Sequence, residues 1–257
     1  MTDLGYIYER GVLSENHTSY FIEPHPEHAL KYYQKASKEN FPRAYNNLGT
    51  LFLTSQGLPE DANGGNTLKG IKYLEKAAQM KYPRAYFNLG KCYENGVGVV
   101  QSLDKARSEY LNGAEINDIQ CKLEFVKSGL GTKINDDRTM ITMVELTRQV
   151  LADDGRNAEA LYYMGLFAEQ GIGMEKNKES SFYYVERAAR MEYAPAITKL
   201  GDFYYSGYFI TKDIEYAKKL YERSSKSDPK AVINLGVLAE KGIGEENDPR
   251  KAQKLYE

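Results

Sequence analysis

A short frame of small and aromatic residues recurs along most of this chain, and it constrains the fold more than any other feature. Its clearest copy is AYFNLGKCYENGVG at residues 85–98, with a small residue, a Leu-Gly pair, a tyrosine and a Gly-x-Gly turn. Self-similarity of this kind is typical of a solenoid built from repeated supersecondary units. Further copies are centred on the pairs at 4–5, 48–49, 164–165, 200–201 and 235–236.

Each repeated unit is predicted to be a pair of helices. In the first helix the small residue, the glycine and the aromatic residue are spaced so that they share one helical face. The second helix ends in a signature such as Lys76-Ala77-Ala78. In the later copies, the middle residue of this signature lies 23 residues after the first-helix glycine. The first-helix glycine of the next repeat lies a further 12 or 13 residues along the chain. The period is therefore about 36 residues.

The frame divides the whole chain, 1–257, into about seven repeats of a single α-solenoid. The extra residues of the first two repeats fall within Ser14–Glu23 and Ser55–Asn66, which are polar and turn-rich and are predicted to be loops. The fourth repeat is degenerate, because Val126 stands where the frame requires glycine, and its second helix is expected over Arg138–Leu151. The predicted repeats are 1–41 (incomplete at its start), 42–82, 83–118, 119–157, 158–194, 195–229 and 230–257 (incomplete at its end).

Proline positions support these helix boundaries independently. Proline is tolerated in the first turn of a helix, where its missing N–H group costs no hydrogen bond. Six of the eight prolines stand where the frame begins a helix, and the aspartates before two of them provide capping side chains. The prolines that precede first helices are Pro42, Pro83, Pro195 and Pro229, and those that open second helices are Pro26 and Pro249.

The frame resembles that of the Sel-one-like repeats, which are relatives of the tetratricopeptide repeat. That family's pattern is A-x-x-x-L-G-x-x-Y-x-x-G-x-G, then a variable turn and a helix ending in K-A-A, and residues 85–98 match it almost position for position. The resemblance covers nearly the whole chain and is weak over 119–157. It implies an all-α, right-handed superhelical solenoid of helix-turn-helix repeats that serves as an adaptor or scaffold in protein complexes.

Composition narrows the range of partners and locations. A net charge of −2 gives no basic surplus for nucleic acid, and no run approaches the ~18 apolar residues of a membrane span. We therefore expect neither nucleic-acid binding nor membrane insertion. The N-terminus shows no signal peptide, and two cysteines are too few for a disulfide scaffold. A cytoplasmic location is expected in preference to the lumen of the secretory pathway.

The residues that could carry chemistry have simpler structural interpretations. The Gly-x-Gly pairs follow a helix and lack a third glycine, so they indicate turns and not a phosphate-binding loop. His25 and His28, with Glu23 and Glu27, lack a third strong metal ligand, and His25 takes the place of a helix-capping residue. Cys92 and Cys121 occupy apolar frame positions and are predicted to be buried. We expect no catalytic residue, no metal and no cofactor. Most of the 22 tyrosines are predicted to lie in the core between helices.

The binding surface is predicted on the first helices, which line the concave face of a solenoid. Side chains two or three residues before the frame glycine, or one after it, would face the groove. Asparagine amides could hold the backbone of a partner there, and aromatic residues could anchor it. The predicted partner-binding residues are Asn46, Asn47, Phe87, Asn88, Lys91, Tyr162, Asp202, Tyr205 and Asn234.

The function predicted from these observations is that of a non-catalytic protein–protein interaction scaffold that positions partners on its concave face. The alternative is the regulatory region of a larger enzyme whose catalytic domain lies outside this chain. RNA binding by helical repeats is disfavoured by the absence of a basic stripe. The chain opens inside a first helix and stops inside a second one, without polar capping repeats. We therefore expect an excerpt of a longer protein, or ends that self-associate or dock into a larger assembly.

Overall fold

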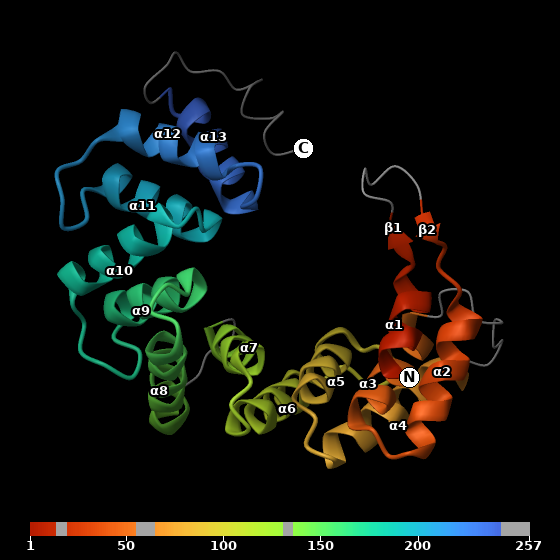
Figure 1. The fold of residues 1–257 in the computed structure, drawn as a ribbon. Helices are drawn as coiled ribbons and strands as arrows, with labels where there is room; N and C mark the ends of the chain where they lie inside the picture. The colour runs from red at the N-terminus through yellow and green to blue at the C-terminus, as the bar shows by residue number, and fades with distance from the viewer. Residues whose placement is uncertain (14–19, 55–64, 131–135, 243–257) are drawn as a thin grey trace. The chain divides into compact units, whose positions relative to one another are not determined.

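The computed structural model describes residues 1–13, 20–54, 65–130 and 136–242 of the chain. Within these ranges the protein is almost entirely helical, which confirms the all-α prediction (Figure 1). The chain forms two compact units, Met1–Ser128 and Gly129–Glu257.

In the first unit, helices α1 to α5 each pack against the next helix along the chain, and α3 also contacts α5. The pairs α1–α2, α3–α4 and α5–α6 are thus helical hairpins, and the first helices of the second and third hairpins lie side by side. The elements of this part are α1 (Thr2–Arg10), β1 (Val12–Leu13), β2 (Tyr20–Ile22), α2 (Pro26–Lys38), α3 (Pro42–Thr54), α4 (Gly65–Gln79), α5 (Pro83–Asn95), α6 (Leu103–Glu115) and α7 (Ile119–Leu130).

The second unit repeats this arrangement, since α8 to α12 each contact the next helix and α11 also contacts α13. Its hairpins α9–α10 and α11–α12 correspond to two further copies of the frame, and α13 is the first helix of the last copy. The helices are α8 (Asp137–Asp153), α9 (Ala158–Gln170), α10 (Lys178–Arg190), α11 (Ala194–Ser206), α12 (Ile214–Ser224) and α13 (Pro229–Glu240).

The helix ends follow the signals in the sequence. Pro26, Pro42, Pro83 and Pro229 are the first residues of α2, α3, α5 and α13, as predicted, whereas Pro249 and the region 55–64 lie outside the described residues. The side chains of Asn157, Asn177, Asp213 and Asp228 accept hydrogen bonds from backbone N–H groups in the first turns of α9, α10, α12 and α13. These caps satisfy donors that a helix N-terminus leaves without a partner.

The glycine inside a first helix allows a side chain of the second helix to approach closely, a tyrosine in three hairpins and Leu74 or Val185 in two others. In α11, a Cβ atom on Gly201 would lie 2.5 Å from Cε1 of Tyr221 on α12. Tyr33 and Tyr110 lie against Gly5 and Gly90 in the same way. The helix therefore tolerates the propensity cost of glycine, about 1 kcal/mol against alanine, because the aromatic ring fills the space that a methyl group would take.

One predicted loop contains regular structure. The insertion at Ser14–Glu23 was expected to be a loop, but Val12–Leu13 and Tyr20–Ile22 pair as a two-stranded antiparallel ribbon beside α1 (Figure 1). The prediction was wrong for the stretch 20–22. The residues that pair are apolar or aromatic, which suits a strand, and Phe21 is 81% exposed there. The sequence pattern of a two-residue strand is too short to be recognised.

Candidate functional site

The structure places all nine predicted binding residues on first helices. Eight of them are partly exposed, whereas Asn46 is 5% exposed. Their role in binding stays a prediction, but their surroundings differ from one repeat to the next. Asn46 and Asn47 lie on α3, Phe87, Asn88 and Lys91 on α5, Tyr162 on α9, Asp202 and Tyr205 on α11, and Asn234 on α13.

The asparagines of the first unit are bonded to one another across the two helices. Nδ2 of Asn88 donates to Oδ1 of Asn46 at 2.9 Å, and Nδ2 of Asn46 donates to Oδ1 of Asn47 at 3.2 Å. This chain of three amides links α3 to α5. The buried amide of Asn46 therefore has partners for both its oxygen and its nitrogen, as the cost of burying an unpaired polar group requires.

Lys91 joins two acidic side chains beside an aromatic ring. Its Nζ atom lies 2.9 Å from Glu94 and 2.8 Å from Glu124. Desolvation lowers the pKa of Lys91, but its hydrogen bonds to Glu124 and Glu94 outweigh burial and raise it. Phe87 lies nearby, with the Arg84 guanidinium 4.4 Å from its ring centroid. Much of this surface is thus already occupied by internal pairs.

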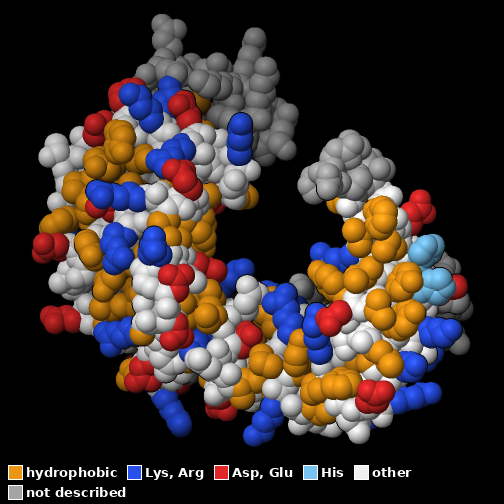
Figure 2. All heavy atoms as spheres, viewed as in Figure 1, with side chains coloured by type: hydrophobic (Ala, Val, Ile, Leu, Met, Phe, Trp, Pro, Cys, Tyr) orange, Lys and Arg blue, Asp and Glu red, His pale blue; other side chains and the backbone are white. Residues whose placement is uncertain are grey.

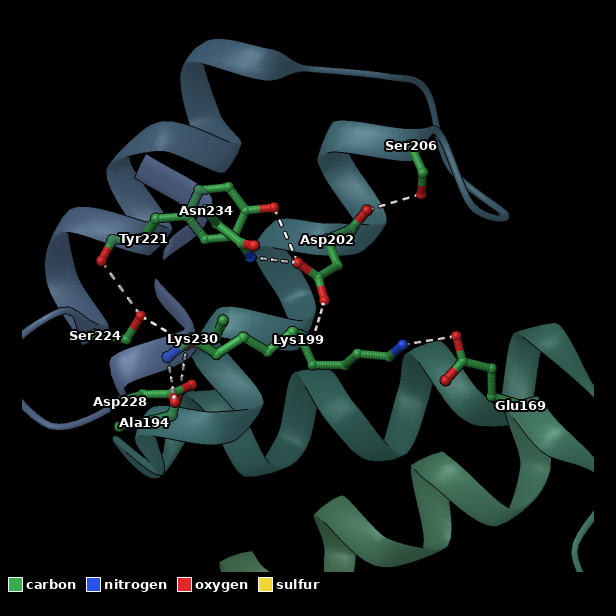
Figure 3. Close-up of polar contacts among 11 residues, drawn as sticks. Glu169, Ala194, Lys199, Asp202, Ser206, Tyr221, Ser224, Asp228, Lys230 and Asn234 are labelled. Carbon is green, nitrogen blue, oxygen red and sulfur yellow. Dashed lines mark hydrogen bonds and ion pairs between the residues drawn. The ribbon is translucent and has the colours of Figure 1, made fainter. Parts of the chain in front are cut away.

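In the second unit, the carboxylate of Asp202 accepts hydrogen bonds from three side chains on two other helices (Figure 3). Its Oδ1 atom accepts from the hydroxyl of Tyr221 at 3.0 Å and from Nδ2 of Asn234 at 2.8 Å. Its Oδ2 atom pairs with Nζ of Lys230 at 2.7 Å. The carboxylate on α11 therefore fixes side chains of α12 and α13. Bonds of this charge-assisted kind are stronger than neutral ones.

An open pocket lies directly over this network. Its volume is about 320 Å³, which falls at the lower end of the range for small-ligand sites. It combines apolar walls, Val237 and Leu238, with the polar groups bound to Asp202. The predicted residues Asp202, Tyr205 and Asn234 are thereby brought together in one site. The lining residues are Asp202, Tyr205, Ser206, Tyr221, Lys230, Asn234, Val237 and Leu238.

The structure separates Tyr162 from this pocket. Its ring packs against Tyr193, with the centroids 5.5 Å apart, and against the neighbouring Tyr163. Burial, and then the negative charge of Asp228 and Asp202, raises the pKa of Tyr162 to about 12. Tyr162 is thus a packing residue between α9 and the start of α11 as well as a candidate contact.

Lys230 was missed by the sequence analysis although a signal exists. A basic residue follows the proline that opens the first helix in three repeats, as Arg43, Arg84 and Lys230. Arg43 pairs with Asp3 at 2.8 Å, and Lys230 pairs with Asp202, so the position serves contacts between neighbouring first helices. Tyr221 was also missed, because it belongs to a second helix, where no binding residue was expected.

The cysteines and histidines show no assembled chemistry. Cys92 and Cys121 are buried, and burial raises the pKa of both thiols, that of Cys92 to about 11. A thiol with a raised pKa is a poor nucleophile at neutral pH. The described histidines, His25 and His28, are exposed (Figure 2), and they form no group of three potential metal ligands with other described residues. His25 is the N-cap residue of α2, as predicted, although its side chain makes no capping hydrogen bond.

Successive helical hairpins with a close-packed glycine and side-by-side first helices define a helical-repeat protein of the α-solenoid class. The sequence profile of the Sel1 repeat matches residues 1–41, 42–82, 83–108, 158–193, 194–228 and 229–257, which is more than half of the chain. The chain therefore belongs to the Sel1 repeat family, and the predicted resemblance is confirmed. In the part of the chain that the structure describes, no helix is both long and apolar enough to cross a bilayer.

Similar proteins cover this chain in different ways. Protein sel-1 homolog 2 from Homo sapiens is 34% identical over 99 residues, which is 38% of this chain and 14% of that protein. The Mus musculus protein of the same name is 33% identical over 110 residues, 42% of this chain and 16% of that protein. The chain thus matches about a seventh of the length of these curated relatives.

Solved structures support the fold along nearly the whole chain. The Sel1 repeat protein from Oxalobacter formigenes superposes with a TM-score of 0.68 and 25% identity, covering 90% of this chain and 92% of that one. A protective antigen of uropathogenic Escherichia coli with an SLR fold gives a TM-score of 0.70 at 22% identity, covering 99% of this chain and 51% of that one. The second similarity concerns the fold alone.

Proposed function

We propose that this chain is a non-catalytic scaffold or adaptor module that positions partner proteins through the exposed face of its first helices. Sel1 repeat proteins generally mediate protein–protein interactions, and the family is typically non-enzymatic. The observation that carries the proposal is the pocket between α11 and α13, which places apolar walls beside polar groups held in fixed positions.

The hydrogen bonds of Asp202 prepare this pocket for a peptide. Asn234 donates to Asp202, and its Oδ1 atom accepts no hydrogen bond from the residues that the structure describes. Lys230 likewise uses one N–H of its ammonium group for Asp202. An acceptor and a donor therefore face an incoming backbone with their rotamers already fixed, which reduces the entropy lost on binding. Val237 and Leu238 would contact an apolar side chain of the same peptide.

The same groups are poorly suited to proton transfer. The ammonium of Lys230 is paired with the carboxylate of Asp202, and burial together with Asp202 raises the pKa of the Tyr221 phenol above its usual value. A general acid or base needs a pKa near the working pH. The arrangement therefore supports recognition of a partner in preference to catalysis.

Quantitative affinity capture from the native source tests this proposal. Val237→Glu places a charge in the apolar part of the pocket from a partly exposed position, so the fold should survive. The matched control is Val100→Glu, at a position that is 87% exposed and belongs to the first unit. We expect specific partners to be lost with Val237→Glu and retained with Val100→Glu. Equal recovery with both variants would exclude the pocket, and turnover of a substrate by this chain alone would overturn the non-catalytic assignment.

A further inference from the structure

Four aromatic side chains form a continuous cluster in the second unit, in which Phe182 and Tyr204 are partly buried and Phe209 and Tyr216 are exposed. Tyr204 on α11 lies between Phe182 on α10 and Tyr216 on α12, with ring centroids 6.5 Å and 4.7 Å away. Phe209, in the turn after α11, lies 6.2 Å from Phe182. Phe209 is 51% and Tyr216 41% exposed. We call these residues, Phe182, Tyr204, Phe209 and Tyr216, the aromatic cluster.

The equivalent place in the first unit shows what such a tyrosine contacts elsewhere in this chain. Tyr93 on α5 occupies the frame position of Tyr204, and Nζ of Lys105 lies 5.4 Å from its ring centroid. Lys105 stands at the position of Tyr216 when the two repeats are aligned on Gly113 and Ser224. On α5, the ring of Tyr93 is therefore in contact with the ammonium group of Lys105. On α11, the ring of Tyr204 is in contact with the ring of Tyr216 at the equivalent position.

The neighbouring positions change in the same direction. By the same alignment, Ile71 and Gly98 of the first unit correspond to Phe182 and Phe209. Around Tyr93 the three positions hold an aliphatic residue, a glycine and a lysine. Around Tyr204 all three hold aromatic residues. Aromatic rings present a negative face that attracts cations, and guanidinium groups stack on such faces.

Phe209 adopts a backbone conformation that usually belongs to glycine. Its φ angle is 65°, close to the 70° of Gly98 and the 59° of Gly173 at the same frame position. A bulky residue is disfavoured in this left-handed region. The chain thus carries an exposed ring at a position where glycine would be less strained, which supports the hypothesis that this side chain has a function.

Acidic groups lie beside the cluster, and Lys212 and Lys178 lie over other rings. An open hollow of about 580 Å³ borders Tyr204 and is also lined by Asp213 and Glu215. Burial is the largest cause that raises the pKa of the Tyr204 phenol. Tyr216, then Glu186 on α10, then Asp213 raise it further. Lys212 also lines the hollow, but its Nζ lies over Tyr205 at 5.6 Å, and that of Lys178 over Tyr208 at 5.1 Å.

We propose that the aromatic cluster is a second binding site, separate from the pocket at Asp202, and that it takes an arginine side chain of a partner protein. The guanidinium stacks on the more exposed rings of the cluster, Tyr216 and Phe209, beside the partly buried ring of Tyr204. Asp213 and Glu215 accept its N–H groups. This site is independent of the proposed function of the pocket, so either can fail without the other.

Titration of the intact chain with short peptides tests the site. The probe is acetyl-Gly-Arg-Gly-amide, and acetyl-Gly-Gln-Gly-amide is the uncharged control. A single side chain held by cation–π and ionic contacts is expected to bind with a dissociation constant of the order of millimolar. Ring resonances of Tyr204 and Tyr216, assigned by NMR from single variants, should shift with the arginine peptide and not with the glutamine peptide.

Two variants separate binding from folding. Phe209→Gly removes a ring and relieves the positive φ angle, so we expect affinity to fall about two- to fivefold while thermal stability stays equal or rises. Tyr216→Lys copies the arrangement at Tyr93 and should abolish peptide binding, because the site then holds its own cation. Tyr20→Leu, on β2 of the other unit and 48% exposed in the native chain, is the control and should leave binding unchanged.

The outcomes are distinct. Selective shifts at the cluster with the arginine peptide, lost in Tyr216→Lys, support the site. Equal shifts with both peptides would overturn the site. So would undiminished binding in both Phe209→Gly and Tyr216→Lys. The site is also overturned if the cluster rings show no shift at a peptide concentration about ten times the expected dissociation constant. Loss of stability in Phe209→Gly would also contradict it, because the ring would then be needed for packing.

Discussion

The hydroxyl of Tyr221 donates a 3.0 Å hydrogen bond to the carboxylate of Asp202 while its ring lies on Gly201 of the same helix as the acceptor. One tyrosine thus fixes both the distance between α11 and α12 and the rotamer of the acid that lines the pocket. The first unit uses the same device, since Tyr33 donates to Glu9 at 2.6 Å and Tyr110 to Glu94 at 2.8 Å. Packing of a hairpin and arrangement of its polar surface are therefore coupled.

Removing the hydroxyl of Tyr221 should destabilise the second unit. Tyr221→Phe keeps the ring on Gly201 but leaves Asp202 with one donor fewer at a largely buried position. We expect a loss of about 1.5 kcal/mol of unfolding free energy, as for a hydrogen bond to a charged group. Urea denaturation followed by circular dichroism measures it. Tyr205→Phe, whose hydroxyl has no partner among the described residues, is the control, and an equal loss in both variants would refute the assignment.

Replacing the buried glycine should be harmful although alanine is the better helix former. In Gly201→Ala the new methyl group would meet Cε1 of Tyr221 at 2.5 Å. We expect a loss of about 1–3 kcal/mol from overpacking in place of the usual gain of about 1 kcal/mol. The control for the steric effect is Gly155→Ala, in the turn between α8 and α9, where the nearest atom is 3.7 Å away. A Gly201→Ala protein as stable as the native one would show that the ring moves aside freely.

A serine in the core offers a stabilising substitution. Ser181 on α10 is fully buried, and its hydroxyl has no hydrogen-bond partner among the residues that the structure describes. Equivalent second-helix positions carry Ala29, Ala106 and Ala217. Because an unpaired buried hydroxyl is costly, Ser181→Ala should raise the unfolding free energy by about 1 kcal/mol.

Ser224 is a buried serine whose hydroxyl is hydrogen-bonded, so its replacement by alanine should lower the unfolding free energy and not raise it. Its hydroxyl lies 2.9 Å from that of Thr198 on α11, and both side chains are buried. Ser224→Ala leaves the Thr198 hydroxyl without this partner, so a loss is expected. If thermal denaturation gave the two serine variants shifts of the same sign, hydrogen bonding would not explain either result.

The stability of the first unit should respond to pH through Glu109. Burial, and then the nearby charge of Glu75, raises the pKa of Glu109, against the hydrogen bond from Asn112. The folded chain therefore keeps this proton to a higher pH than the unfolded chain, and stability falls as pH rises through that interval. Glu109→Gln should raise the urea midpoint at pH 7 and have little effect near pH 4, where the native side chain is also protonated. An equal effect at both pH values would exclude ionisation as the cause.

Much of the fold can be predicted from local sequence signals. Pro83, the Leu89-Gly90 pair and the turn at Gly96 together specify the start, the packed face and the end of α5, and the structure has these features where predicted. The ribbon at Tyr20–Ile22 was not predicted, because strand pairing depends on a partner segment that a short pattern does not identify.

The candidate site could be predicted only in part. The frame placed Asp202, Tyr205 and Asn234 on first helices, and these three residues do line one pocket. It did not reveal that Asn46 is bonded to Asn88, or that Lys91 is held by Glu94 and Glu124. Asn46–Asn88 and Lys91–Glu124 join residues 33 or more positions apart, so no local spacing encodes these two pairs.

The sequence by itself determined the repeated helical hairpin, since the periodicity of small and apolar residues, the prolines and the turn glycines each act within a few residues along the chain. Tertiary structure alone decided which polar side chains form hydrogen bonds or ion pairs within the chain and which remain accessible to a partner. That outcome depends on distances between helices of adjacent repeats, as when Asp202 meets Lys230 and Asn234 of α13. It is also what leaves the rings of Tyr204 and Tyr216 together, in a place where the repeat of α5 has a lysine.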